Sequence, residues 1–101
     1  KGQLYIFSNL NIYDINVFTK YEDINKKKGI LQTGWNVWSV KAIKDHFKNI
    51  KKVKFFKFTS KIGRKQNKKD LMRSWTIKLN NKNHYTNGLN MIQNQFLVKI
   101  S

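Results

Sequence analysis

Short segments rich in β-forming residues recur along this chain and constrain its fold more than any other feature. Turns that contain Asn, Asp or Gly separate them. Seven segments have the length and pattern of strands, namely residues 3–10, 15–22, 30–38, 51–58, 73–79, 84–86 and 95–100. One further segment has helical spacing. The sequence therefore predicts an α+β fold with a mostly antiparallel sheet, hairpins and one main helix at about residues 39–49.

The predicted helix has a well-defined start. Ser39 is a good N-cap because its hydroxyl can accept a hydrogen bond from an amide of the first turn. Val40, Ile43 and Phe47 then fall on one apolar stripe, with charged residues on the opposite face. Asn49 can end the helix.

The second and third predicted strands are expected to pair as a β-hairpin around a polar turn at residues 23–29. A helix over residues 15–24 is the alternative, since Ile15, Phe18 and Tyr21 also fit a spacing of three.

The remaining strands differ in how their apolar residues alternate. The first is a continuous apolar run, which is typical of a buried strand. In the fourth, Val53 and Phe55 share one face and Phe56 and Phe58 the other, so both faces are partly covered or a bulge intervenes. In the fifth and last strands, alternate apolar residues point inward. These are Trp75, Ile77 and Leu79, and then Phe96, Val98 and Ile100.

Three polar segments in the second half predict loops or turns. Residues 60–70 are basic and contain Gly, and residues 80–83 separate two strands. Asn87-Gly88 predicts a tight turn because both residues tolerate a positive φ.

The chain lacks the residue clusters from which most active sites and metal centres are built. It has no Cys and only two His, His46 and His84, neither of which lies in a G-x-S-x-G sequence. Glu22 and Asp23 are adjacent, so on a strand they would point to opposite faces. The five Gly are too far apart for a phosphate-binding loop. We therefore expect no catalytic residue and no metal site in this chain.

The formal net charge of +16 has two interpretations. A surface selected to bind polyanions would usually use Arg as well as Lys, yet only Arg64 and Arg73 accompany 19 Lys. Lys occurs here with 13 Asn and many Ile, Phe and Tyr, all residues with A/T-rich codons, so codon bias is the other interpretation. No apolar run approaches the ~20 residues that span a bilayer, so we expect a cytoplasmic protein without a membrane partner.

Nucleic acid is the partner that the polyanion interpretation implies. Phenylalanines interleaved with lysines at residues 54–58 resemble base-stacking platforms, although an RNA-recognition strand would carry glycines that are missing here. Core packing of these phenylalanines is the competing interpretation. The candidate nucleic-acid residues are Lys54, Phe56, Lys57, Arg64 and Lys65.

Trp35 and Trp38 lie three residues apart just before the helix. In an extended chain their indoles point to opposite faces, so at most one of them can be in the core. Two roles are open for these tryptophans: they pack on the sheet, or they form a wall of a substrate site.

Three short motifs and a final strand follow one another in a recognisable order. They are Gly34-Trp35-Asn36 before the helix, Ser74-Trp75-Thr76-Ile77-Lys78, Asn87-Gly88-Leu89 and a closing strand from Phe96 to Lys99. In this order they resemble the C-terminal part of class I S-adenosylmethionine-dependent methyltransferases.

The resemblance implies a place for each element in the family's sheet. Residues 5–10 would be its fifth strand, residues 40–49 its last helix, and residues 53–58 and 95–100 its last two strands. The family's glycine-rich cofactor loop and its acidic residue after the second strand belong to a half that this sequence does not contain. Residues 1–101 would thus be a single domain or the C-terminal fragment of a larger methyltransferase domain.

The resemblance also implies a cofactor and partners. The full-length protein would use S-adenosylmethionine, whereas this chain alone would bind no cofactor and be inactive. A small-molecule substrate would contact Asn9, Asn11, Tyr13 and Trp35. Exposed strand edges could pair two copies of the chain into a homo-oligomer.

Overall fold

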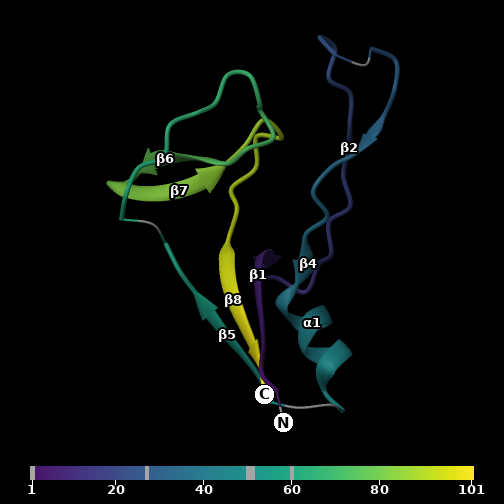
Figure 1. Cartoon of the computed structure of the whole chain (residues 1–101), viewed down its shortest axis with the longest axis vertical. Helices are drawn as coiled ribbons and strands as arrows, with labels where there is room; N and C mark the ends of the chain where they lie inside the picture. The colour runs from purple at the N-terminus through teal and green to yellow at the C-terminus, as the bar shows by residue number, and fades with distance from the viewer. Residues whose placement is uncertain (1, 27, 50–51, 60) are drawn as a thin grey trace.

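The structure, a computed structural model, describes residues 2–26, 28–49, 52–59 and 61–101. These residues form eight strands and one helix (Figure 1). In chain order the elements are β1 (Leu4–Asn11), β2 (Lys20–Tyr21), β3 (Gln32–Thr33), β4 (Trp38–Ser39), α1 (Val40–Phe47), β5 (Val53–Lys57), β6 (Trp75–Leu79), β7 (Lys82–Thr86) and β8 (Gln95–Ile100). The predicted α+β class with mostly antiparallel pairing and one main helix is confirmed. Lys51 and Ser60, which open two predicted segments, lie outside the described residues.

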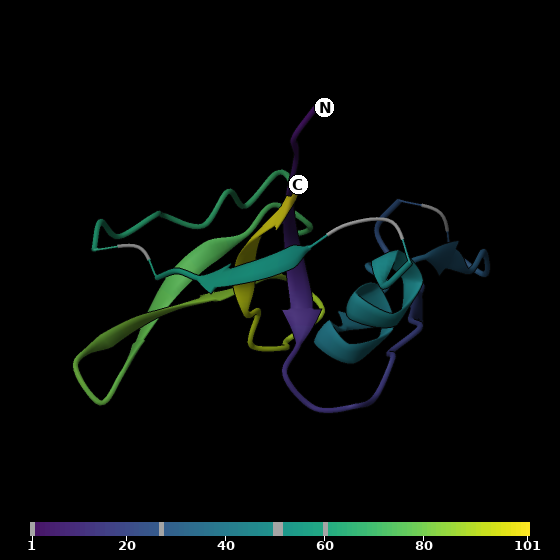
Figure 2. The ribbon, with the colours of Figure 1, turned by 90° about the horizontal axis from the view of Figure 1, so that it is seen from below.

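The main sheet has four strands in the order β4-β1-β8-β5. The terminal strand β8 lies between β1 and β5 and runs antiparallel to both. β4 is parallel to β1 and pairs with it at only two positions. Two separate hairpins, β2–β3 and β6–β7, complete the described strands. In Figure 1 and in Figure 2, α1 lies beside β1 and the β6–β7 hairpin lies at the opposite end of the molecule.

One face of the main sheet carries the core. Leu10 is 2% exposed and Val98 is 1% exposed, and Phe96 and Ile100 are buried with them. Val40, Ile43 and Phe47 of α1 pack against this cluster together with partly buried residues of β1 and β5. The predicted alternation of β8 is therefore confirmed, and so is the predicted apolar stripe of the helix.

The start of α1 follows the sequence prediction. The backbone N–H of Ala42 donates to the Ser39 hydroxyl at 3.0 Å, which is the expected N-cap bond. The Ser39 N–H in turn donates to the Asn16 side-chain oxygen at 2.7 Å. α1 ends at Phe47, two residues before the predicted Asn49.

The β2–β3 hairpin forms, but its strands are much shorter than predicted. Lys20 pairs with Thr33, whereas Val17 pairs with Val37, so three residues oppose two between these positions. This extra residue is a β-bulge, which interrupts the ladder. The alternative helix over residues 15–24 is wrong, because no residue in this range is helical.

The close approach of Gly34 to Thr19 fixes the bulge. The Gly34 N–H donates to the Thr19 carbonyl at 2.8 Å, and the Thr19 hydroxyl donates to the Trp35 carbonyl at 3.1 Å. A Cβ at position 34 would lie 2.3 Å from the Thr19 hydroxyl oxygen, so only Gly fits here without a shift. Strand periodicity alone did not reveal this contact.

The β6–β7 hairpin turns more tightly than predicted. Asn80 and Asn81 both have a positive φ, 52° and 61°, and form a two-residue turn. Lys82 and Asn83, predicted to belong to the turn, instead pair with β6. The prediction that Leu79 points inward is wrong, since it is 45% exposed at the tip of a hairpin that projects beyond the main sheet.

The Asn87-Gly88 turn is present, but the predicted reason for it is wrong. Among the described non-glycine residues near it, Asn90 rather than Asn87 has a positive φ, at 59°. The Asn90 N–H closes the turn by donating to the Asn87 carbonyl at 2.9 Å. Gly88 is needed for space instead, because a Cβ there would lie 2.8 Å from the Leu71 carbonyl oxygen.

The second face of the main sheet is uncovered, which contradicts the prediction that the first strand is buried. Phe7 of β1 is 64% exposed and Phe56 of β5 is 49% exposed, and both pair across Leu97 of β8. Tyr5 is 53% exposed on the same face, and the rings of Phe7 and Phe58 lie 4.4 Å apart. We call Tyr5, Phe7, Phe56, Phe58 and Leu97 the open face. The sequence identifies these residues as apolar, but it does not show that α1 covers only the opposite face of the main sheet.

Within the described part of the chain, no helix has the length and apolar character needed to cross a lipid bilayer.

Replacement of Leu10 by Ala tests the position of the core. Because Leu10 is 2% exposed, we expect Leu10→Ala to lower the free energy of unfolding by about 2–5 kcal/mol in urea denaturation. Leu31→Ala is the matched control, since Leu31 is 68% exposed and its loss should cost within about 0.5 kcal/mol. Equal losses for the two variants would contradict the assigned core.

Candidate functional site

A hollow of about 190 Å³ lies at the carboxyl end of β1. It is lined by Asn9, Leu10, Asn11, Val17, Val37, Met91, Ile92 and Asn94. We call it the amide hollow, because its polar side chains are all carboxamides. The structure thus brings two of the four predicted substrate residues, Asn9 and Asn11, to one cavity.

Hydrogen bonds hold the walls of the amide hollow in place. The Asn94 N–H donates to the side-chain oxygen of Asn9 at 2.8 Å, and the Leu10 N–H donates to the Asn94 carbonyl at 2.9 Å. The first of these bonds joins residues 85 positions apart in the sequence. No local sequence signal pointed to Asn94, because its role depends on where β8 pairs.

Asn11 organises the loop that follows β1. Its side-chain oxygen accepts from the Tyr13 N–H at 3.0 Å, and its side-chain nitrogen donates to the Ile15 carbonyl at 3.0 Å. Both ends of this carboxamide are therefore occupied by the backbone. Asn11 therefore shapes the rim of the hollow.

The lining of the amide hollow limits what it can do chemically. All of its residues are apolar or carry neutral amides, so it can hydrogen-bond a polar uncharged group and cover apolar surface. None of the lining residues titrates near neutral pH, so the hollow supplies no general acid or base. Its role would be to bind and orient.

Tyr13 and Trp35, the other two predicted substrate residues, do not line the amide hollow. Tyr13 is 69% exposed on the loop after β1, and Trp35 is 37% exposed beside the bulge. Trp38 is 45% exposed and its ring meets Phe18 edge-on, with centroids 5.4 Å apart. Neither indole is in the core, which agrees with the prediction that at most one could be.

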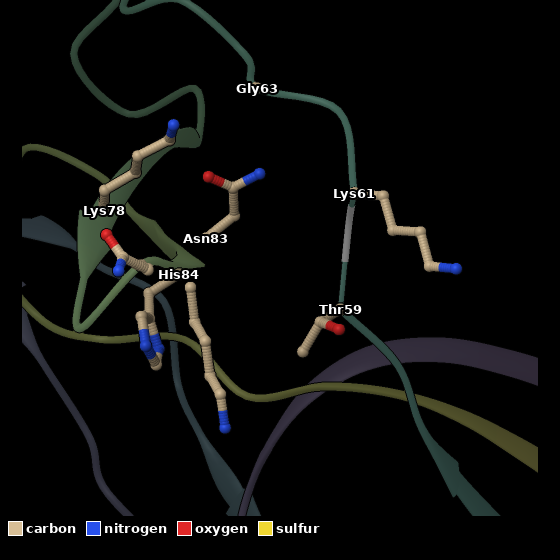
Figure 3. Close-up of a pocket in the computed structure, with 8 residues that line it drawn as sticks. Thr59, Lys61, Gly63, Lys78, Asn83 and His84 are labelled. Atoms are coloured by element: carbon tan, nitrogen blue, oxygen red, sulfur yellow. The ribbon is translucent and has the colours of Figure 1, made fainter.

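A larger hollow, about 730 Å³ in volume, lies between the β6–β7 hairpin and the segment after β5 (Figure 3). Its lining is Thr59, Lys61, Gly63, Lys78, Asn81, Lys82, Asn83 and His84. We call it the lysine hollow. Lys78 and Asn83 are direct partners across the hairpin, and Figure 3 shows Asn83 projecting toward the segment that carries Gly63. The Lys61 side chain extends away from the hairpin, at the outer rim.

A second basic hollow of about 370 Å³ adjoins the same segment of chain. It is lined by Arg64, Lys65, Asn67 and Arg73, and we call it the arginine hollow. The backbone of Arg64 is held against β6, since its N–H donates to the Thr76 hydroxyl at 2.7 Å and its carbonyl accepts from the Thr76 N–H at 3.0 Å. Both arginines of the chain therefore meet in one place.

The five residues predicted for nucleic-acid binding do not share one surface. Lys54 and Phe56 lie on the same side of β5 as the open face, whereas Lys57 points to the other side of that strand. Arg64 and Lys65 line the arginine hollow.

The two histidines and the adjacent carboxylates, Glu22 and Asp23, lie in different parts of the fold. The His46 ring meets Phe47 edge-on with centroids 4.8 Å apart, and His84 lines the lysine hollow. Glu22 accepts from the Gly29 N–H at 2.8 Å and Asp23 from the Asn25 N–H at 3.0 Å, so both stabilise the hairpin turn. Among the residues that the structure describes, no three His or acidic side chains are placed to hold a metal ion.

One exposed ion pair neutralises part of α1. The Lys41 ammonium hydrogen-bonds to the Asp45 carboxylate at 2.8 Å. This hydrogen bond holds the pKa of Asp45 below its ordinary value and raises the pKa of Lys41. The pair lies on the helix, away from the lining residues of all three hollows.

Comparisons of this chain with protein-family models, with curated proteins and with solved structures found no match.

Substitution of Asn11 tests its role in shaping the rim. We expect Asn11→Ala to speed hydrogen exchange of the Tyr13 amide up to about tenfold, because one hydrogen bond is worth about 0.5–1.5 kcal/mol. Asn11→Asp retains the acceptor oxygen and should leave that amide protected. If NMR shows the same exchange rate in Asn11→Ala as in the wild type, the loop is held in another way.

Proposed function

We propose that this chain is the substrate-side, C-terminal part of an S-adenosylmethionine-dependent methyltransferase. The observation that carries the proposal is the pairing of β8. The resemblance requires the closing strand to pair beside the opening one or its neighbours, and β8 pairs with β1 on one side and with β5 on the other.

The connection between the elements supports the same proposal. β1 and β5 are both antiparallel to β8, so they are parallel to each other. Parallel strands need a crossover connection, and α1 lies between β1 and β5 in the sequence and packs on the core face of the sheet. This matches the roles that the resemblance gives to residues 5–10, 40–49 and 53–58.

One edge and one face of the main sheet are largely uncovered, which supports the proposal that a cofactor-binding half is missing. On the side of β4, only Leu10 and Asn11 of β1 are paired within the described residues, so most of that edge can accept another strand. The open face leaves large aromatic side chains exposed side by side, and an exposed apolar patch of this kind is typical of a surface that another layer covers. A cofactor-binding half that adds strands beyond β1 and covers the open face would complete both this edge and this face of the sheet.

The amide hollow is the part of the chain suited to the methyl acceptor. It opens at the carboxyl end of β1, and Asn9 and Asn94 fix its geometry. Binding of the sulfonium cofactor would depend on the other half, since no glycine-rich loop is present. The chain would hold and orient an acceptor, and the methyl transfer would require both parts.

A free-standing nucleic-acid-binding module built on Lys54, Phe56, Lys57, Arg64 and Lys65 is the alternative function. It has less support, because these residues are spread over both sides of β5 and the arginine hollow.

Cofactor binding tests the proposal directly. We expect isothermal titration of S-adenosylmethionine into the 101-residue chain to show no binding, and into the polypeptide extended by its upstream coding sequence to show binding. Micromolar affinity of the 101-residue chain itself would contradict the proposal. So would an upstream sequence without a glycine-rich strand-to-loop motif.

The open face gives a second test. An uncovered apolar sheet face should bind a hydrophobic dye, so we expect Phe7→Ser with Phe56→Ser to reduce 8-anilinonaphthalene sulfonate fluorescence several-fold. Phe18→Ser is the matched control, because Phe18 is as exposed as Phe7, at 64%, but lies outside this face. Equal reductions would show that the dye does not report on the open face.

A further inference from the structure

The charge of this chain is unevenly distributed along the sequence. Residues 46–101 contain 14 of the 21 basic residues but only one of the five acidic residues, Asp70. The other four carboxylates lie between residues 14 and 45, where two of them stabilise the hairpin turn and Asp45 pairs with Lys41. The second half therefore carries most of the net charge.

The fold gathers part of this charge around two hollows on one segment of chain. The lysine hollow and the arginine hollow are built on the same segment of chain, which supplies Gly63 to the first and Arg64 to the second. We call the cations of the two hollows the basic track. They are Lys61, Arg64, Lys65, Arg73, Lys78 and Lys82.

Strand geometry keeps the two hollows close together. Arg64 is held by Thr76 of β6, and Lys78 lies two residues further along the same strand. Because a strand rises about 3.3 Å per residue, these positions are about 7 Å apart along β6. Nucleic acids carry one phosphate per about 3.4 Å of helix axis on each strand, so phosphates about two positions apart on one strand could occupy both hollows.

Among the described residues, no carboxylate lines either hollow to compete with an anion. Asp70, the acidic residue nearest in sequence, accepts from the Met72 N–H at 3.2 Å and so holds its own loop. The lysine hollow also contains polar side chains that can hydrogen-bond phosphate oxygens, namely those of Thr59 and His84.

From this arrangement we propose that the basic track binds the phosphate backbone of a nucleic-acid strand. Two adjoining cationic hollows fit a chain of phosphates, whereas a single phosphate would engage only one of them. The contacts are to phosphates and not to bases, so binding is expected to depend little on sequence and strongly on salt. This proposal is independent of the methyltransferase proposal, since it uses none of the residues of the amide hollow.

Charge-matched variants separate the track from the overall charge of the chain. The track variant is Lys78→Gln with Lys82→Gln, and the control is Lys20→Gln with Lys28→Gln, which removes equal charge from the distant hairpin. The probe is a fluorescein-labelled oligouridine of about 16 nucleotides, followed by anisotropy between about 50 and 200 mM salt.

We expect the track variant to bind at least about tenfold more weakly at low salt. The slope of log affinity against log salt should decrease in size by about 1.4, which corresponds to two lost contacts on a single strand. The control should retain nearly the wild-type slope. A second track variant, Arg64→Gln with Arg73→Gln, should behave like the first.

The proposal is overturned if the control loses as much affinity as the two track variants, because binding would then reflect net charge alone. It is also overturned if the wild-type protein does not bind the probe at low salt. Circular dichroism of each variant verifies its fold, and two independent track variants prevent one misfolded protein from deciding the result. Titration with S-adenosylmethionine tests the methyltransferase proposal separately.

Discussion

The structure depends on the pairing of β8 with two neighbours at once. Residues near the start of the chain and residues after α1 are brought together only because β8 bonds to both β1 and β5. Phe96, Val98 and Ile100 then line the buried side of the same strand, so one segment supplies both the central hydrogen bonds and the centre of the core. In so small a domain this concentration matters, because the total buried apolar surface is modest.

Features with a local cause could be predicted from the sequence. Ser39 caps α1 with its own hydroxyl, and the alternation of β8 places Phe96, Val98 and Ile100 on one side whatever lies around them. Features that depend on a residue far away in the sequence could not be predicted in this way. The bulge beside Gly34 depends on Thr19, the space at Gly88 depends on Leu71, and the exposure of Phe7 depends on which face α1 covers.

The same distinction explains what was predictable of the candidate site. Asn9 and Asn11 were expected at a substrate site only because of the family resemblance, which places substrate contacts around the loop after the first strand. Asn94 completes the amide hollow through a bond to Asn9 that spans most of the chain, so its contribution follows only from the topology. Trp35 is conspicuous in the sequence, yet its carbonyl rather than its ring makes the hydrogen bond that the structure records.

Codon bias can enrich a chain in Lys, but it cannot place residues next to one another in space. The only two arginines, separated by eight residues, line one hollow, and Thr76 holds the backbone of one of them against β6. The acidic residues are meanwhile found mostly in the first half, where Glu22 and Asp23 accept from backbone amides and Asp45 pairs with Lys41. The chain thus separates a neutral, amide-lined cavity at the end of β1 from a cationic surface on the β6–β7 hairpin. A uniform compositional bias does not predict such a separation, so the arrangement of the charge, more than its size, supports the proposal that the basic track binds a polyanion.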